Sequence, residues 1–188
     1  MPFRLLGLVA DANLASNLSG RVFAHYAASG TDVTLVCAAS DWSATDHKSV
    51  ARRLGVRDLI LLDYALSELT VAALEGVFAD VIASVRPHVV LADGSPPAIR
   101  EAASSAFLRV RRASGGSSAL PAKLYYRWSS TAPLVSVTTS ITVPGSSPEL
   151  FVRVFPDPWV TGVLERDLFA GVPTEIEAAS RVDQQMAS

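Results

Sequence analysis

The fold is decided near the amino terminus, by the stretch FRLLGLVADANLASNLSG at residues 3–20 and the helix and strand that follow it. An apolar run, Phe3–Val9, leads into a small polar loop, Ala10–Gly20. Arg21–Ser29 then has the composition of a helix, and Thr31–Ala38 is a second apolar run. This order of elements is typical of an α/β fold, which normally places its chemistry where the first strand meets the first helix.

The loop after the first strand holds few reactive groups. Residues 10–17 read ADANLASN and contain one carboxylate, Asp11, with no histidine and no lysine. A metal or phosphate site needs several well-placed donors. The loop by itself therefore predicts neither kind of site.

The composition indicates an ordered domain with a substantial core. The chain has 188 residues, of which 49% are hydrophobic and 18% are charged, so disorder is not expected. The formal net charge of −2 gives no electrostatic attraction to nucleic acid. The basic cluster of Arg109, Arg111 and Arg112 is expected to form the solvated end of a helix, where cations suit the helix dipole.

Membrane segments, leader peptides and disulfides are not expected. No apolar stretch reaches the roughly 20 residues that span a bilayer, and the start Met1-Pro2-Phe3-Arg4 lacks the layout of a signal peptide. The single cysteine, Cys37, forms no internal disulfide and is expected to be a small buried hydrophobe. We therefore expect a cytoplasmic protein that binds neither membranes nor nucleic acid.

Strand and helix signals alternate through residue 112. Apolar runs predict strands at Arg4–Val9, Asp32–Cys37, Asp58–Leu62 and His88–Ala92. Helices are expected at residues 21–29, 46–54 and 98–112, and a further helix begins after a cap at Ser67 or Thr70. That helix has apolar positions spaced by three and four residues: Leu74, Val77, Phe78, Val81, Ile82 and Val85. Such units with short linkers predict the α/β class, with a Rossmann-like, mostly parallel sheet and flanking helices.

The character of the sequence changes after the segment GGSS at residues 115–118. Strand signals follow at Lys123–Trp128, Leu134–Val143 and Glu149–Phe155, and Thr174 and Glu177 have the spacing of a capping box for a last helix. We expect a single domain over residues 1–188, with a Rossmann-like half at 3–112 and a β-rich extension at 119–172.

Seven short segments occur in the order found in one enzyme family. They are LLGLV (5–9), YAASG (26–30), DVTLV (32–36), VARRLGV (50–56), LLDY (61–64), RPHVVL (86–91) and DLFAG (167–171). In order and spacing they resemble the LmbE/PIG-L family of zinc-dependent N-deacetylases. That family includes the N-acetylglucosaminyl-phosphatidylinositol de-N-acetylases and the deacetylases of mycothiol and bacillithiol synthesis. The resemblance extends over residues 3–172 and implies the family's fold.

The resemblance also implies where a catalytic site would lie. Family members carry a His-Pro-Asp-Asp motif after the first strand and a His-Pro-Asp-His motif after the fourth. The first His, the second Asp of the first motif and the last His bind zinc, and the first Asp is the general base. By the resemblance these positions fall on Ala10, Asn13, Ala98 and Ala12, and a further acidic position falls on Leu14. Every ligand and base position therefore departs from the family's pattern.

These departures predict that the zinc chemistry is lost. Alanine offers no donor atom, and the Asn13 amide oxygen is a poor, uncharged ligand. Without zinc, no bound water has its pKa lowered to roughly 7 to supply hydroxide. The three histidines, His25, His47 and His88, contain no pair at the i, i+4 spacing of a helical metal site. We expect neither zinc nor another cofactor.

A candidate pocket is expected at the carboxyl ends of the strands. Its residues are Asp11, Asn13, Asp41, Asp46, Asp93 and Ser95, and Asp63 also follows a predicted strand. A carboxylate in an apolar pocket there could act as acid or base. Carboxylates after strands also form ordinary turns and caps, and Asp46 is open to both readings: a sugar contact by the resemblance, or a helix cap.

Two functional hypotheses follow. The first is a catalytically degenerate member of the deacetylase family that acts as a binding, regulatory or partner-subunit protein. The second is an enzyme with metal-independent chemistry in the same cleft, acting on an amino-sugar or amino-acid conjugate. Both allow a small-molecule ligand or a protein partner, and both allow homo- or hetero-oligomers.

Overall fold

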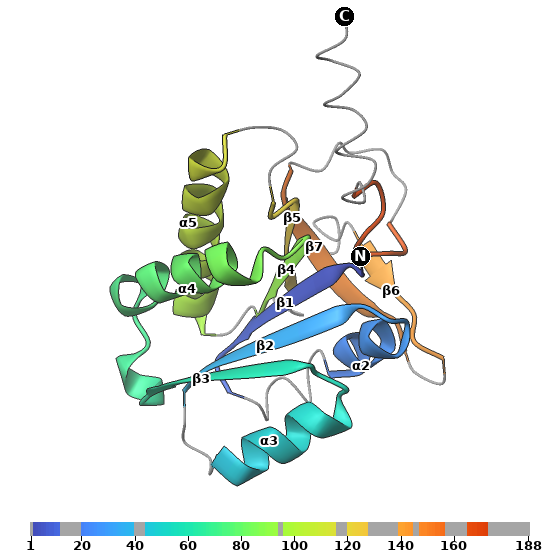
Figure 1. The fold of residues 1–188 in the computed structure, drawn as a ribbon, viewed down its shortest axis with the longest axis horizontal. Helices are drawn as coiled ribbons and strands as arrows, with labels where there is room; N and C mark the ends of the chain where they lie inside the picture. Colours follow the sequence, from blue (N-terminus) through green and yellow to red (C-terminus); the bar gives the residue numbers. More distant parts are fainter. Residues whose placement is uncertain are drawn as a thin grey trace, which may run out of the picture.

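The computed structural model describes residues 2–11, 20–39, 44–93, 96–115, 120–127, 139–144, 147–156 and 165–172, without the side chains of 44–46. The strands are β1 (Arg4–Val9), β2 (Asp32–Ala39), β3 (Asp58–Tyr64), β4 (Val89–Ala92), β5 (Lys123–Arg127), β6 (Thr139–Ile141) and β7 (Glu149–Phe155). The helices are α2 (Gly20–Ala28), α3 (Ala44–Arg53), α4 (Val71–Val85) and α5 (Pro97–Ala113), with a 3₁₀ turn η2 at Leu66–Glu68. The expected α/β class is confirmed (Figure 1).

One sheet of seven strands runs through the described structure in the order β3-β2-β1-β4-β5-β7-β6. The first five strands are parallel, and β7 and β6 add antiparallel pairings at one edge. The central strands β1, β2 and β4 are buried nearly throughout, which explains their continuous apolar sequences. The mostly parallel, Rossmann-like arrangement predicted from the sequence is confirmed.

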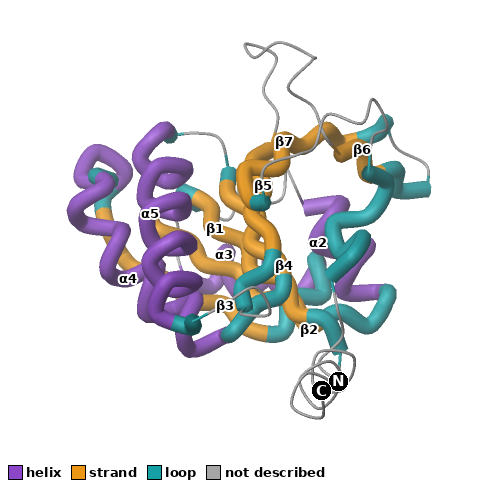
Figure 2. The backbone as a smooth tube through the Cα atoms, turned by 90° about the horizontal axis from the view of Figure 1, so that it is seen from above, coloured by secondary structure: helices purple, strands orange, loops and turns teal. Residues whose placement is uncertain are grey.

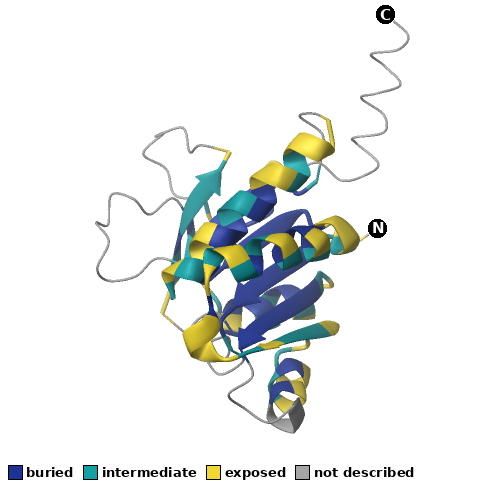
Figure 3. Cartoon of the chain, turned by 90° about the vertical axis from the view of Figure 1, so that its left-hand side faces the viewer, coloured by how far each residue is buried: buried dark blue, intermediate teal, exposed yellow. Residues whose placement is uncertain are grey.

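The helices cover the two faces of the sheet. Figure 2 shows α4 and α5 on one side and α2 on the other. Val50 of α3 packs against the cluster that contains the inner residues of α2, so α3 belongs to the α2 side. Figure 3 shows the central strands of the sheet, between the helices, in dark blue, because these strands carry much of the buried core.

Close packing of α2 on the sheet depends on one glycine. A Cβ atom at Gly7 of β1 would lie 2.6 Å from a ring carbon of Phe23 and 2.9 Å from a methyl group of Leu35. Phe23 itself is fully buried. Gly7 therefore lets the Phe23 ring approach the backbone of the central strand.

The helix with the clearest periodicity, α4, has defined ends. The side chain of its N-cap, Thr70, accepts a hydrogen bond from the backbone N–H of Ala73 at 3.2 Å. Arg86 ends the helix in the left-handed region at φ 50°, and Pro87 follows. Of the two caps considered from the sequence, Thr70 is the one used for α4.

One strand differs from its expected form. β3 continues to Tyr64, and Asp63 lies inside it with φ 61°. The pairing of β2 with β3 shifts between Cys37 and Ala39, as expected for a bulge. The expectation that Asp63 follows the strand is therefore wrong, and its exposed side chain sits on an edge strand.

Other element ends differ by one or two residues, as helix termini commonly do. Several expectations lie outside the described residues: Trp128, the first part of Leu134–Val143, and the last helix near Thr174 and Glu177. No helix among the described residues is both long enough and apolar enough to cross a membrane.

Candidate functional site

The carboxyl edge of the parallel strands contains a topological switch point between β1 and β4. The chain moves from β1 to β2 and β3 on one side, and then returns to place β4 on the other side of β1. Leu8 pairs with Ala92, and Val9 pairs with Cys37, so β1 and β4 end at nearly the same level and β2 continues two residues further, to Ala39. Ligands of open α/β sheets bind outside the carboxyl ends of strands at such a point.

Two of the candidate carboxylates follow these strands directly. Asp11 comes two residues after β1, and Asp93 comes immediately after β4. The backbone N–H of Asp93 donates to the carbonyl of Leu8 at 2.9 Å, which holds the start of that loop against β1. The structure thus places Asp11 and Asp93 at the switch point.

The first zinc-ligand position of the resemblance is occupied by part of the apolar core. Ala10 is fully buried and belongs to the cluster that includes Leu6 and Leu8 on the α4/α5 side of the sheet. The backbone N–H of Ala39 donates to its carbonyl at 2.6 Å. The Ala10 methyl group is therefore a core contact. Ala98, the last ligand position, is half-buried in the first turn of α5.

Asp11 lies close enough to Cys37 to influence it electrostatically. Burial, together with the negative charge of Asp11, raises the pKa of the Cys37 thiol to about 12. Cys37 is fully buried, which confirms its expected place in the core. A thiol that stays protonated near neutral pH is a poor nucleophile.

The structure adds one histidine to this end of the molecule. His47 is fully buried and lies in the first turn of α3, just after the chain leaves β2. Asp93, with 4% of its surface exposed, is also buried. Sequence analysis placed His47 only at a helix start, and no local pattern showed that its ring faces inward.

The structure does not describe the remaining candidate residues. Asn13, Asp41, Ser95 and Ala12 lie outside the described residues, as does the side chain of Asp46. No group of three or more His, Cys, Asp or Glu side chains within the described ranges could hold a metal ion. With a core methyl at Ala10 and a second methyl at Ala98, the described positions do not fit the zinc site of the family.

A second polar group, which sequence analysis missed, lies inside the β-rich extension. The carboxylate of Glu165 accepts hydrogen bonds from Lys123 Nζ at 3.1 Å and from Arg153 Nη1 at 2.6 Å. Its other oxygen accepts from the hydroxyl of Tyr125 at 2.7 Å and from that of Thr139 at 3.2 Å. We call these five residues the Glu165 cluster.

The Glu165 cluster is largely withdrawn from water. The side chains of Lys123, Arg153 and Glu165 are 7%, 14% and 22% exposed. Burial would raise the pKa of Glu165, but hydrogen bonds from Tyr125 and Lys123 and the charges of Lys123 and Arg153 outweigh it, so the pKa is lowered. Burial lowers the pKa of Lys123, although Glu165 opposes this, and burial also raises the pKa of Tyr125.

The cluster fastens the segment 165–172 to the rest of the molecule. The backbone of Glu165 pairs with Thr139 of β6. Two residues on, Asp167 accepts a hydrogen bond from the hydroxyl of Tyr26 in α2 at 2.9 Å, and that hydroxyl accepts from the N–H of Leu168 at 2.8 Å. The sequence hint was a charged residue, Lys123, placed directly before the apolar and aromatic residues Leu124, Tyr125 and Tyr126 of β5.

Comparison with known proteins shows similarity at the level of the fold. No protein-family model matches the chain, and no curated protein matches it. The crystal structure of the conserved protein TT1542 from Thermus thermophilus matches with a TM-score of 0.54 and 18% identity, covering 74% of this chain and 72% of that one.

Two enzymes are also similar. The 4-carboxy-2-hydroxymuconate hydratase GalB from Pseudomonas putida KT2440 matches with a TM-score of 0.51 and 17% identity, over 69% of this chain and 66% of that one. The A40926 pseudoaglycone deacetylase Dbv21 matches with a TM-score of 0.49 and 18% identity, over 68% and 64%. Because a hydratase has this fold too, the fold alone does not decide the reaction. The expected fold is confirmed: the chain shares the α/β architecture of TT1542.

Proposed function

We propose that this chain is a catalytically degenerate relative of the LmbE/PIG-L deacetylases, acting as a binding, regulatory or partner-subunit protein. One observation carries the proposal. The residue at the first zinc-ligand position, Ala10, is a fully buried core residue beside Leu6 and Leu8. A methyl group in that place supplies no lone pair, and the apolar surroundings disfavour a charged ion.

The residues at the other motif positions also support the loss of the zinc site. Asn13 and Ala98 replace the remaining ligands of the resemblance, and Ala12 replaces the general base. A zinc ion held by a single remaining carboxylate, Asp11, would lack the three protein ligands of a catalytic site. The proposal therefore assigns the switch point to binding rather than to hydrolysis.

The proposed role requires a partner, which is a small molecule at the switch point or another protein. A cytoplasmic location, with association into homo- or hetero-oligomers, belongs to the same proposal. No nucleic acid is included, because the net charge of −2 provides no attraction to a polyanion.

The metal content of the purified protein tests the loss of the zinc site. After incubation with zinc and removal of the free ion, we expect far less than one zinc per chain by elemental analysis. An Asp11→Asn variant is the matched control, because it removes a carboxylate that the structure places at the switch point. Stoichiometric zinc in the parent protein that disappears in this variant would overturn the proposal.

A second function is favoured by one specific observation. Asp93 is 4% exposed at the switch point, which is unusual for a carboxylate that serves only as a turn former. In this alternative, Asp93 is an acid or base of a metal-independent enzyme that acts on an amino-sugar or amino-acid conjugate.

Measuring the release of amine from N-acetylated amino sugars and amino acids distinguishes the degenerate binding protein from the metal-independent enzyme. The alternative expects turnover that is lost in an Asp93→Asn variant and kept in an Asp63→Asn variant, which makes the same change on an exposed strand residue. The first proposal expects no turnover in any of the three proteins. Activity that both variants retain would contradict the role of Asp93.

A further inference from the structure

The outer surface of α4 has an unusual composition for a helix that faces water. Only Glu75 and Asp80 are charged among its 15 residues. Its exposed positions are Ala72, Gly76, Asp80, Ala83 and Ser84, of which only Asp80 is charged. A surface helix normally carries charged residues opposite its buried face, and a helix that lacks them is usually covered by another structure.

Glycine at position 76 fits a covered surface better than an open one. A Cβ atom placed there would meet nothing within 4 Å, so the fold of the single chain does not need a glycine. In the middle of a helix, glycine costs about 1 kcal/mol relative to alanine. Close approach by another helix is a physical reason to keep it.

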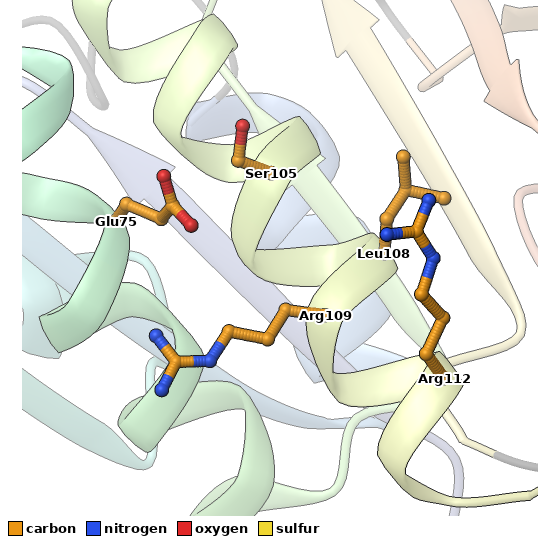
Figure 4. A pocket seen from close by; sticks show the side chains of 5 residues that line it. All are labelled: Glu75, Ser105, Leu108, Arg109 and Arg112. Carbon is orange, nitrogen blue, oxygen red and sulfur yellow. The ribbon is translucent and has the colours of Figure 1, made fainter.

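A surface hollow of about 480 Å³ lies between α4 and α5, next to this small-residue surface. It is lined by Glu75 of α4 and by Ser105, Leu108, Arg109 and Arg112 of α5. Figure 4 shows Arg109 reaching toward α4, while Arg112 lies beside Leu108. Leu108 is 38% exposed, and it is one of two large hydrophobic side chains classed as exposed in the described part of the chain.

The hollow carries charges of both signs. In the described structure, Glu75, Arg109 and Arg112 make no hydrogen bond or ion pair with another described residue. One carboxylate and two guanidinium groups thus border an apolar centre at Leu108. A two-fold symmetric contact requires a surface that complements itself, with each charged group facing its opposite on the second copy.

We propose that the outer face of α4 and α5 is a homodimer interface. In this arrangement, Glu75 of one copy faces Arg109 and Arg112 of the other, Leu108 fills the hollow of the partner, and Gly76 permits close contact of the two α4 helices. The inference is independent of the proposed loss of catalysis, because it uses no residue at the carboxyl edge of the sheet.

The available surface suits a modest dimer. Helices of 15 and 17 residues are about 22 Å and about 25 Å long at about 1.5 Å per residue. Two such helices side by side offer a face of roughly 500 Å² per chain, or roughly 1,000 Å² for both, which is near the lower limit for a specific interface. We expect a dissociation constant in the micromolar range and weaker association at high salt.

Charge reversal tests the pairing directly. Sedimentation should show that Glu75→Arg weakens self-association about tenfold or more, because three basic groups then face three others. A variant with both Arg109→Glu and Arg112→Glu should be weakened likewise. Mixing the two variants should restore a dimer that contains one chain of each kind, since opposite charges then meet. If the mixture stays monomeric while the parent dimerises, the pairing is wrong.

Gly76→Gln tests the close approach of the helices without harming the fold. Glutamine is the better helix former, and a Cβ atom at this exposed position meets nothing within 4 Å, so the melting temperature should not fall. The dimer should be lost, because the long side chain separates the two α4 helices. A parent protein that stays monomeric at concentrations near 1 mM would overturn the proposal. So would a Gly76→Gln variant that dimerises as the parent does, or a face that binds an unrelated acidic peptide but no second copy of the chain.

Discussion

The buried position of Ala10 at the carboxyl edge and the interior of the β-rich extension differ in what they bury: a methyl group in one and paired charges in the other. At the carboxyl edge, where the family resemblance places a zinc ligand, Ala10 is a buried methyl group in an apolar cluster. In the extension, Glu165 joins two cations and two hydroxyl groups in a largely buried cluster. The paired buried ions of the Glu165 cluster therefore lie away from the carboxyl edge, where they hold segment 165–172 in place.

A buried charged cluster is not by itself a reaction site. The Glu165 carboxylate accepts four hydrogen bonds, so its oxygen atoms are already occupied. Burying ions is costly unless they are paired and hydrogen-bonded, and here the pairing is extensive. We interpret the Glu165 cluster as a structural clamp and the switch point at Asp11 and Asp93 as the place for a ligand.

The largest expected effect is that of breaking the clamp. Glu165→Gln leaves Lys123 and Arg153 as neighbouring buried cations without their carboxylate. We expect the free energy of unfolding to fall by about 3 kcal/mol, the lower end of the range for breaking a buried ion pair. Urea denaturation measures it. Glu101→Gln, the same change on the exposed face of α5, is the control and should leave the midpoint unchanged; equal midpoints for both variants would contradict the clamp.

A slightly smaller loss of stability is expected from a substitution at Ala10, at the carboxyl edge of the sheet. Ala10→His forces a ring into a fully buried space, and such overpacking should cost about 2 kcal/mol. Thermal unfolding with and without zinc measures both stability and binding. Ala28→His, at the exposed end of α2, is the control. A melting temperature of Ala10→His that rises with zinc would show that this position faces the crevice instead of the core.

Tyr26 tests whether the clamp extends to α2. Tyr26→Phe removes the hydroxyl that donates to Asp167 and accepts from the buried N–H of Leu168. We expect a loss of about 1.5 kcal/mol, because that N–H is left without this acceptor. Tyr64→Phe removes a single longer hydrogen bond, 3.3 Å, to the carbonyl of Ala73, and its loss in the same urea titration should be smaller. If Tyr64→Phe costs more unfolding free energy than Tyr26→Phe, the proposal that segment 165–172 is held from both sides is wrong.

Acid sensitivity gives the smallest and most specific readout. Because the pKa of Glu165 is lower in the folded state than its ordinary value, the unfolded chain binds the proton more readily. The stability supplied by this ionised carboxylate is complete above its unfolded pKa, roughly 4.3. It is lost as the pH falls through the folded pKa. The difference in unfolding free energy between the parent and Glu165→Gln should therefore shrink below pH 4, and a constant difference would argue against the ionised clamp.

Much of the fold was predictable from local patterns. Continuous apolar runs located β1, β2 and β4, because strands buried on both faces need no polar alternation. The spacing of Leu74, Phe78 and Ile82 located α4, since all three lie on its buried side. The bulge that keeps Asp63 within β3 was not predictable, because it depends on how β2 and β3 pair.

The candidate site was predictable only in part. Asp11 and Asp93 reach the switch point because parallel strands bring their carboxyl ends to one edge. The Glu165 cluster was missed because its members are far apart in the chain: Lys123 and Glu165 are separated by 42 residues. A local sequence pattern does not show which distant side chains come into contact.

The order of strands and helices could be read from the residues and their neighbours in the chain, and so could the lack of side-chain ligand atoms at positions 10, 12 and 98. The core position of the Ala10 side chain and the place of Glu165 between Lys123 and Arg153 follow from the fold alone. Side-chain periodicity is set within a few residues, whereas burial and ion pairing depend on strand order and register across the whole sheet.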